Sequence, residues 1–437
     1  MSDSLAYLIG VVLLLLGIGF SIGLHEIGHL LPAKLFGARV TRYMIGFGPT
    51  LFSRKRGETE YGLKLIPLGG YIAISGMLPP EGQKQKFGRL ATWIRDSRRN
   101  QAAIDGEYDQ SRAFYLLSVP KRIIVMLGGP FMNLVLGLVF FSIALMGIGA
   151  WQTSTKIDQV SECIQAWDST AKCASTDPVS PAKLAGLRHG DHIVAVNQVP
   201  VTTIDDLRTQ LEGKQGVAVS LQVQRGQKLL DIKVTPQAML APYADPKTGQ
   251  MVVGADKKPL LKEKPVLGVT LQAARIPYSA QKTAQFSGEV IGQTGQLILG
   301  LPQKLYLLVA DMVQGKDRAT DGPVSIVGVS DIVGKVAQDD QYDAVGKLST
   351  GLMMLGSLNI GLFVFNLIPL LPLDGGHVLN ALYEGIKRNL FKLFKKRDPG
   401  PVDTAKMLPF TTVMWFVLLA VGLLVIAADF VNPVQLG

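Results

Sequence analysis

Long uncharged stretches alternate with polar segments along this chain, and four of these stretches are long enough to cross a lipid bilayer. They cover residues 4–24, 123–155, 348–373 and 407–428. An α-helix needs about 20 mainly apolar residues to span the hydrocarbon core. The pattern therefore predicts a polytopic α-helical membrane protein with about four transmembrane helices.

The polar segments differ in charge, and this difference predicts their sidedness. Arg and Lys are concentrated in residues 31–122 and 387–397, whereas residues 151–350 are close to neutral in a chain of formal net charge +10. Loops rich in Arg and Lys remain on the cytoplasmic side of a membrane. We therefore expect the two basic loops inside the cell and the long neutral segment outside. Basic residues beside a membrane usually set orientation or contact anionic lipid, so we expect the lipid bilayer and no nucleic acid as a partner.

These observations divide the chain into eight predicted segments. In chain order they are transmembrane helix 1 (1–36), a cytoplasmic β-loop and polar loop (37–118), transmembrane helix 2 (119–150), an extracytoplasmic domain (151–275), amphipathic juxtamembrane helices (276–347), transmembrane helix 3 (348–385), a basic cytoplasmic loop (386–405) and transmembrane helix 4 (406–431). The β-loop is predicted because residues 37–72 are partly alternating and punctuated by glycine, a pattern typical of turns and strands. Residues 80–111 are polar, and we expect them to be mobile.

A polar motif, H-E-x-x-H, lies at the inner end of the first apolar stretch and comprises His25, Glu26 and His29. Residues four apart lie on the same face of a helix, so the two imidazoles can bind one zinc ion. In metalloproteases with this spacing the glutamate is the general base. Ionisable groups inside a membrane are costly and mark functional sites, so we consider two packed structural histidines the weaker interpretation.

A catalytic zinc usually has three protein ligands, and Asp374 is the predicted third ligand. It follows the third apolar stretch, in which Pro369 and Pro372 interrupt the helix. Backbone groups freed in this way must line a cavity or be buried in protein, which brings a carboxylate to an interior site. Two alternatives remain at this point: Asp374 caps the helix that follows, or His377 is the ligand in its place.

Two motifs together resemble the site-2 protease family of intramembrane zinc metalloproteases. H-E-I-G-H lies in the first apolar stretch, and N-x-x-P followed by L-D-G lies in the third. A further family element, G-P-x-x-N, matches residues 129–133. The resemblance covers nearly the whole chain, with the motifs in the right order.

The third motif departs from the family pattern N-x-x-P-x-P-x-L-D-G at one position. Leu371 stands where the second proline is expected, and proline follows one place later at Pro372. The spacing from Asn366 to Asp374 is unchanged. The resemblance therefore still implies that Asn366 helps to hold the substrate backbone or the reaction oxyanion.

The resemblance implies hydrolysis of peptide bonds within transmembrane segments of single-pass membrane proteins, such as anti-sigma factors or remnant signal peptides. Such substrates would first be cut outside the membrane by another protease. Zn²⁺ is the implied cofactor, with His25, His29 and Asp374 as metal ligands and Glu26 as the catalytic base. We expect this site near the cytoplasmic face of a bacterial inner membrane, because Glu26 lies at the inner end of an outside-to-inside helix.

The neutral segment contains a second resemblance, because residues 180–193 read S-P-A-x-x-A-G-L-x-x-G-D-x-I and are similar to PDZ domains. Residues 151–275 have room for one PDZ-like α+β domain. PDZ domains bind peptides by adding a strand to a sheet edge, and Leu267-Gly268-Val269 is the expected peptide-binding strand. Cys163 and Cys173 are predicted to form a disulfide, which is typical of extracytoplasmic proteins. One such domain with paired cysteines suggests an actinobacterial type.

The sequence is also compatible with two functions other than proteolysis. A metal transporter would need several sets of intramembrane ligands along the membrane depth, and the sequence offers one set. A non-catalytic membrane scaffold that presents the PDZ-like domain would be expected to have a broken H-E-x-x-H motif, and the motif is intact. Both remain weaker hypotheses than an intramembrane zinc metalloprotease.

Overall fold

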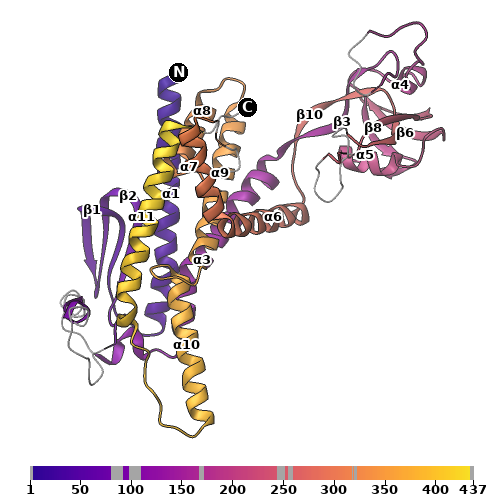
Figure 1. Cartoon of the computed structure of the whole chain (residues 1–437). Helices are drawn as coiled ribbons and strands as arrows, with labels where there is room; N and C mark the ends of the chain where they lie inside the picture. Colours follow the sequence, from indigo (N-terminus) through magenta and orange to yellow (C-terminus); the bar gives the residue numbers. More distant parts are fainter. Residues whose placement is uncertain are drawn as a thin grey trace. The chain divides into compact units, whose positions relative to one another are not determined.

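The computed structural model describes residues 3–79, 92–97, 110–166, 172–243, 251–253, 259–316, 318 and 322–433. The chain divides into two compact units (Figure 1). Unit 1 comprises residues 1–147 and 278–437, and unit 2 comprises residues 148–277. The predicted polar loop lies mostly outside the described residues.

Four helices of the described residues are long and apolar enough to cross a membrane, which confirms the predicted number of spans by length and composition. They are α1 (Asp3–Leu35), α3 (Val119–Ser142) with its continuation η3 (Ile143–Ile148), α9 (Ala344–Asn366), and α11 (Leu408–Val431) with the preceding turn η4 (Thr404–Met407). A fifth span results if α6 (Ala280–Leu299) and α7 (Leu301–Gln314), which are bent by 68°, act as one broken span.

The second apolar stretch does not end as a helix. The helix stops at Ile148, two residues before the predicted end at residue 150, and residues 150–155 of the uncharged stretch begin strand β3. Gly149 separates the two elements with a φ of +89°, a left-handed conformation that glycine adopts without steric cost. An apolar run with a glycine break fits either element, so the uncharged stretch extends past the end of the helix.

The segment predicted as amphipathic juxtamembrane helices forms α6, α7 and α8 (Ile326–Gln338). Within unit 1, α8 packs against the first half of α1, where Val333 shares a small apolar core with Leu14 and Ile18. Asp429 of α11 accepts hydrogen bonds from the backbone N–H groups of Ser325 and Gly328, at 2.9 and 3.1 Å. These contacts tie the start of α8 to the last apolar helix.

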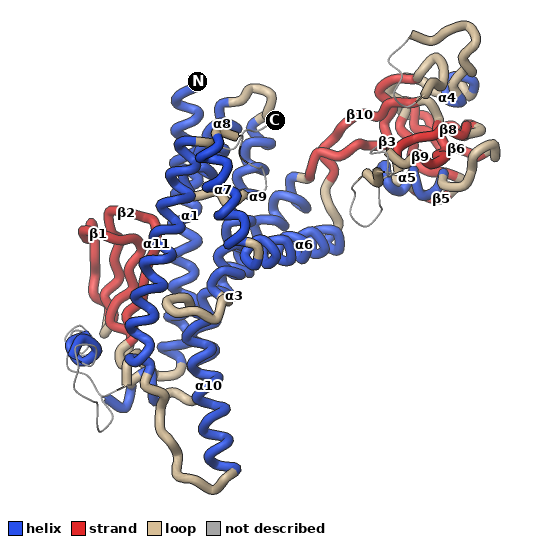
Figure 2. The backbone as a smooth tube through the Cα atoms, in the orientation of Figure 1, coloured by secondary structure: helices blue, strands red, loops and turns tan. Residues whose placement is uncertain are grey.

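A two-stranded antiparallel sheet follows α1, as the glycine-punctuated pattern predicted. Strand β1 (Val40–Arg56) pairs with β2 (Thr59–Ile74) through several register shifts. The end of the sheet nearest α1 is buried, and Val40 and Ile74 belong to a core shared with α1 and α3. The other end exposes Phe52 and its apolar neighbours. Figure 2 shows this sheet in unit 1.

Unit 2 contains a mixed arrangement of strands and short helices around its own core. The main sheet has the strand order β10-β3-β4-β6-β7, and β5 pairs with β4. The elements are β3 (Ala150–Val160), α4 (Pro181–Leu184), β4 (His192–Val196), β5 (Val199–Pro200), α5 (Ile204–Leu211), β6 (Val219–Arg225), β7 (Lys228–Val234) and β10 (Val269–Ile276). A separate hairpin of β8 (Gln237–Pro242) and β9 (Leu261–Val266) was not predicted.

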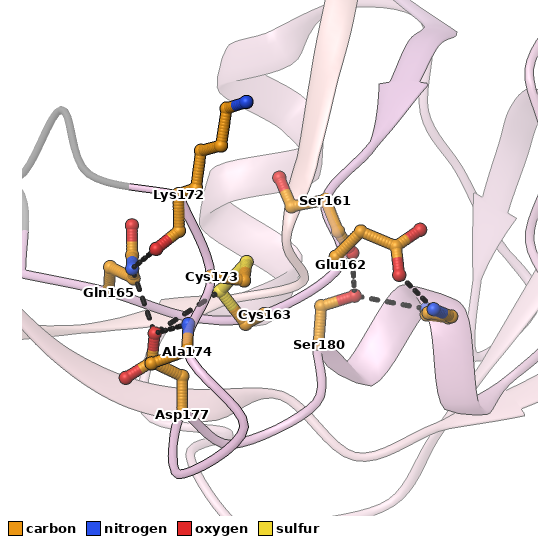
Figure 3. Close-up of a disulfide and its surroundings, with 10 residues drawn as sticks. Ser161, Glu162, Cys163, Gln165, Lys172, Cys173, Ala174, Asp177 and Ser180 are labelled. Carbon is orange, nitrogen blue, oxygen red and sulfur yellow. Dashed lines mark hydrogen bonds and ion pairs between the residues drawn. A yellow bond between two sulfur atoms is a disulfide. The ribbon is translucent and has the colours of Figure 1, made fainter.

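Cys163 and Cys173 form a disulfide within unit 2, as predicted (Figure 3). The bridge closes a short loop whose end is held by Asp177. The Asp177 carboxylate accepts hydrogen bonds from the Ala174 backbone N–H and from the side chain of Gln165, both at 2.8 Å. One covalent bond and a local polar network therefore hold the described ends of this loop together.

Candidate metal centre

Three predicted metal ligands meet inside unit 1. His25 and His29 lie on one face of α1, which continues unbroken through the motif to Leu35. Asp374 is the first residue of helix α10 (Asp374–Leu393). Among the described residues, these three side chains form the group of histidine and carboxylate atoms that could hold a metal ion. The turn between α9 and α10 thus brings Asp374 to the two histidines, which are more than 340 positions away in the sequence.

The size of this group fits zinc. The Nε2 atoms of His25 and His29 are 3.2 Å apart, and Oδ2 of Asp374 lies 3.5 Å from the first and 3.4 Å from the second. A tetrahedral zinc ion with ligand bonds of about 2.0–2.1 Å requires its ligand atoms to be about 3.3–3.4 Å apart. The three atoms therefore already have the spacing that a tetrahedral ion needs. Three protein ligands would leave the fourth coordination position open.

The turn before α10 explains how Asp374 reaches the histidines. Gly375 packs so closely against the end of α9 that a Cβ atom there would lie 2.5 Å from the carbonyl oxygen of Leu367. The N-cap of α10 is Leu373, which makes no side-chain capping bond, and Asp374 is already inside the helix. The alternative that Asp374 serves as a helix cap is therefore wrong, and its carboxylate faces the imidazoles instead.

Glu26 directly follows His25 on α1. Its side chain is buried and lies against strand β2. A Cβ atom on Gly70 would approach its Cγ to 3.1 Å, and the backbone N–H of Ile72 hydrogen-bonds to its carboxylate. The sheet is fixed to α1 nearby, because the hydroxyl of Tyr43 donates a hydrogen bond of 2.8 Å to the carbonyl of Gly23. The strand therefore holds Glu26 in place beside the histidines.

A cavity of about 380 Å³ opens onto these groups. It is bordered by the motif residues, by Asn366 at the end of α9, by Pro372 and His377, and by residues 70–72 of β2. His377 faces the cavity, but the group with metal-ligand spacing contains Asp374. Asn366 is half-buried at the cavity wall.

Helix α3 supplies a steric feature that sequence reasoning did not identify. A Cβ atom on Gly129 would lie 2.2 Å from Nε2 of His29 and 2.7 Å from Nε2 of His25. The space required by the ligand atoms thus exists because residue 129 has no side chain. The G-P-x-x-N element was the only sequence signal at this position, and no function was assigned to Gly129 from it.

Charged pairs fix the elements around the site. Arg112 donates to both carboxylate oxygens of Glu58, at 2.7 and 2.8 Å, and this guanidinium holds the pKa of the Glu58 carboxyl below its usual range. Arg122 of α3 donates to Glu384 of α10, whose side chain is 1% exposed, at 2.5 and 3.1 Å. Glu384 also accepts from the backbone N–H of Val402 at 2.9 Å. This buried pair ties the helix that begins with Asp374 to α3.

Comparisons with known proteins agree with this geometry. Residues 13–397 match peptidase family M50. The chain is 32% identical to the zinc metalloprotease Rip1 of Mycobacterium tuberculosis over 98% of this chain and 99% of that protein. It is 31% identical to Rip1 of Mycolicibacterium smegmatis, with 98% of each chain covered. A putative zinc metalloprotease of Clostridium perfringens is 27% identical over 97% of this chain and 99% of its own. The chain therefore belongs to peptidase family M50, the site-2 proteases, and is a zinc metalloprotease of the membrane.

Proposed function

We propose that this protein hydrolyses peptide bonds within transmembrane segments of single-pass membrane proteins, with His25, His29 and Asp374 as zinc ligands and Glu26 as the general base. The observation that carries the proposal is a ligand triangle sized for zinc beside a buried glutamate, at one cavity among apolar helices. Zinc supplies Lewis-acid chemistry that polarises a carbonyl and makes water more acidic.

The residues around the cavity can be assigned roles in this reaction. Glu26 accepts a proton from the attacking water and returns it to the leaving amide nitrogen, the usual cycle of a general acid–base group. His25, His29 and Asp374 use one ligand atom each, which leaves a position for the water and the substrate. The Asn366 amide, at the cavity wall, donates a hydrogen bond to the substrate backbone or to the oxyanion.

Strand β2 is proposed to hold the substrate in an extended form. A helical substrate hides its peptide bonds, so it has to unwind before hydrolysis. Residues 70–72 of β2 border the cavity directly beside Glu26, which supports a strand-to-strand arrangement there. Main-chain hydrogen bonds of this kind give affinity with little dependence on the substrate sequence.

The domain assignment and sidedness are proposed from charge and from the folded units. The basic loops face the cytoplasm, and unit 2 lies outside the cell as a PDZ-like domain of a bacterial inner-membrane protein. The disulfide in unit 2 supports this placement, because disulfides persist in oxidising compartments. Of the expected peptide-binding strand, Leu267 and Gly268 lie between β9 and β10 and only Val269 is in a strand. The backbone N–H of Ala182 in α4 donates to the carbonyl of Leu267 at 2.8 Å.

The proposed location of unit 2 outside the cell is the basis of the proposed substrate class. A PDZ-like domain outside the membrane can bind a newly exposed chain end or exclude an intact ectodomain. The substrates are therefore single-pass proteins already cut by another protease, of the anti-sigma-factor or remnant-signal-peptide type. A transporter would need further ligand groups, and in the described parts of the chain His25, His29 and Asp374 form the group found.

Cysteine labelling tests the sidedness. Lys228→Cys in unit 2 is expected to react with a membrane-impermeant maleimide in intact cells, and Lys396→Cys in the basic loop only after lysis. Both lysines are exposed, so their accessibility depends on the membrane side and not on burial. The native cysteines are joined in the disulfide and serve as the unlabelled background. Labelling of Lys396→Cys in intact cells would contradict the proposed topology and indicate the opposite orientation.

Metal content tests the third ligand. Asp374→Ala removes one of three ligand atoms and is expected to lower bound zinc well below the wild-type stoichiometry, measured by elemental analysis of purified protein. Asp398→Ala is the matched control, because Asp398 is an exposed carboxylate that pairs with Arg388 beyond the end of α10. Unchanged zinc in Asp374→Ala would remove this residue from the site.

A further inference from the structure

The two histidine ligands differ in what holds their second ring nitrogen. Nδ1 of His29 lies 2.7 Å from the carbonyl oxygen of Val125. A carbonyl only accepts hydrogen bonds, so Nδ1 carries the proton and the Nε2 lone pair faces Asp374. Metal-binding histidines commonly have such a partner, because it fixes the tautomer and the ring orientation.

The corresponding partner of His25 is a side chain. Nδ1 of His25 lies 3.0 Å from Nδ2 of Asn133, which is fully buried on α3. The amide oxygen Oδ1 of Asn133 has no hydrogen-bond partner among the described residues. The contact with His25 is therefore the polar interaction that determines how the amide is oriented.

The direction of this hydrogen bond decides whether His25 can bind zinc. The oxygen and nitrogen of an amide are nearly identical in shape, and their assignment follows from the hydrogen-bond network. With the nitrogen at this position, the amide donates to Nδ1, and Nε2 carries the ring proton and has no free lone pair. A turn of the amide by 180° places the oxygen there instead, so that the ring proton sits on Nδ1 and Nε2 is free to bind the ion.

We propose that Asn133 is a positioning residue, whose carbonyl oxygen accepts a hydrogen bond from Nδ1 of His25 and so presents Nε2 to zinc. Val125 and Asn133 are eight residues apart on α3, so one face of this helix orients both histidines. The inference rests on the proposed function, because it requires His25 to be a zinc ligand. It adds a residue to which the sequence motif assigned no role.

The two partners also differ in how they can be tested. The Val125 oxygen belongs to the backbone and persists in any side-chain variant. Asn133 can be replaced, so the orientation of His25 depends on a single side chain. Asn133→Leu keeps a branched side chain of somewhat larger volume and removes the acceptor, whereas Asn133→Asp keeps an acceptor and removes the N–H donors.

The experiment measures zinc affinity of the full-length protein in detergent by competition with a chelator. Asn133→Leu is expected to weaken zinc binding by about 10–100-fold, the usual effect of removing such a partner. Asn133→Asp is expected to bind zinc about as well as the wild type. Asn359→Leu is the matched control, because Asn359 is another buried amide of the bundle, 1% exposed and bonded to Ser21 at 2.9 Å. Its zinc affinity is expected to be unchanged.

The outcomes separate this inference from the proposed function. Wild-type zinc affinity in folded Asn133→Leu overturns the role of Asn133 and leaves the ligand set intact. A loss in Asn133→Asp equal to that in Asn133→Leu overturns the proposed acceptor direction. A wild-type protein without zinc contradicts the proposed function itself. If Asn133→Leu does not fold, Asn133→Ala is compared with Asn359→Ala, which removes the same atoms without adding volume.

Discussion

Glu26→Gln is expected to abolish cleavage of a membrane substrate and to leave bound zinc unchanged. The substitution keeps the shape of the side chain and its contact with β2 but removes the proton acceptor beside the ligand triangle. General acid–base groups contribute about 10²–10⁴-fold to rate, so cleavage should fall by at least about 10²-fold. The measurement is the rate at which a tagged substrate fragment appears in cells, with zinc determined on the purified variant.

Glu60→Gln provides the control for this substitution. Glu60 lies on β2, the strand against which Glu26 packs, and makes an exposed ion pair with Arg42, with 3.7 Å between the charged atoms. The same change of carboxylate to amide at this position should leave cleavage near the wild-type rate. A substrate fragment that forms at the wild-type rate in Glu26→Gln would show that Glu26 is not the base.

Gly129→Ala is expected to eliminate both zinc binding and proteolysis. The added methyl group would lie 2.2 Å from Nε2 of His29, well inside van der Waals contact, and the imidazole must move or the helices must separate. Either movement breaks the spacing of about 3.3–3.4 Å that a tetrahedral ion requires. Elemental analysis of the purified variant measures the loss directly.

The control for Gly129→Ala lies on the same helical segment. A Cβ atom on Gly147 would meet no atom within 4 Å, so Gly147→Ala tests the effect of alanine for glycine without a steric clash. This variant should retain zinc and activity. Full zinc occupancy in Gly129→Ala would mean that the space over the histidines is not needed by the ion.

The sequence allowed the ligand set to be predicted because its chemistry is local. The helical spacing of His25 and His29 is visible as a motif, and a buried carboxylate after a proline-broken span is rare enough to identify Asp374. The apolar stretches likewise predicted the long helices. These features depend on residue type and period, which the sequence contains directly.

Other features depend on distances between elements and could not be predicted. The role of Gly129 follows from the short distance between α3 and the imidazoles. The residues around Gly129 in the sequence do not indicate this close contact. The second helix ends at Ile148, within the second apolar stretch, because Gly149 turns the chain from helix into strand. The β8–β9 hairpin was missed because its strands lie on either side of a polar stretch of low strand propensity.

The close crossing of α1 and α3 has a consequence for how the protease admits its substrate. A Cβ atom on Gly28 would lie 2.2 Å from the carbonyl oxygen of Gly128, so the two backbones touch and cannot slide past each other. The Val125 carbonyl, Gly129 and Asn133 form one stripe along α3, and a shift by a single residue would misalign all three with the histidines. The position of α3 along α1 is therefore fixed. We expect any widening of the cavity to involve the β-hairpin and not a shift of α1 along α3.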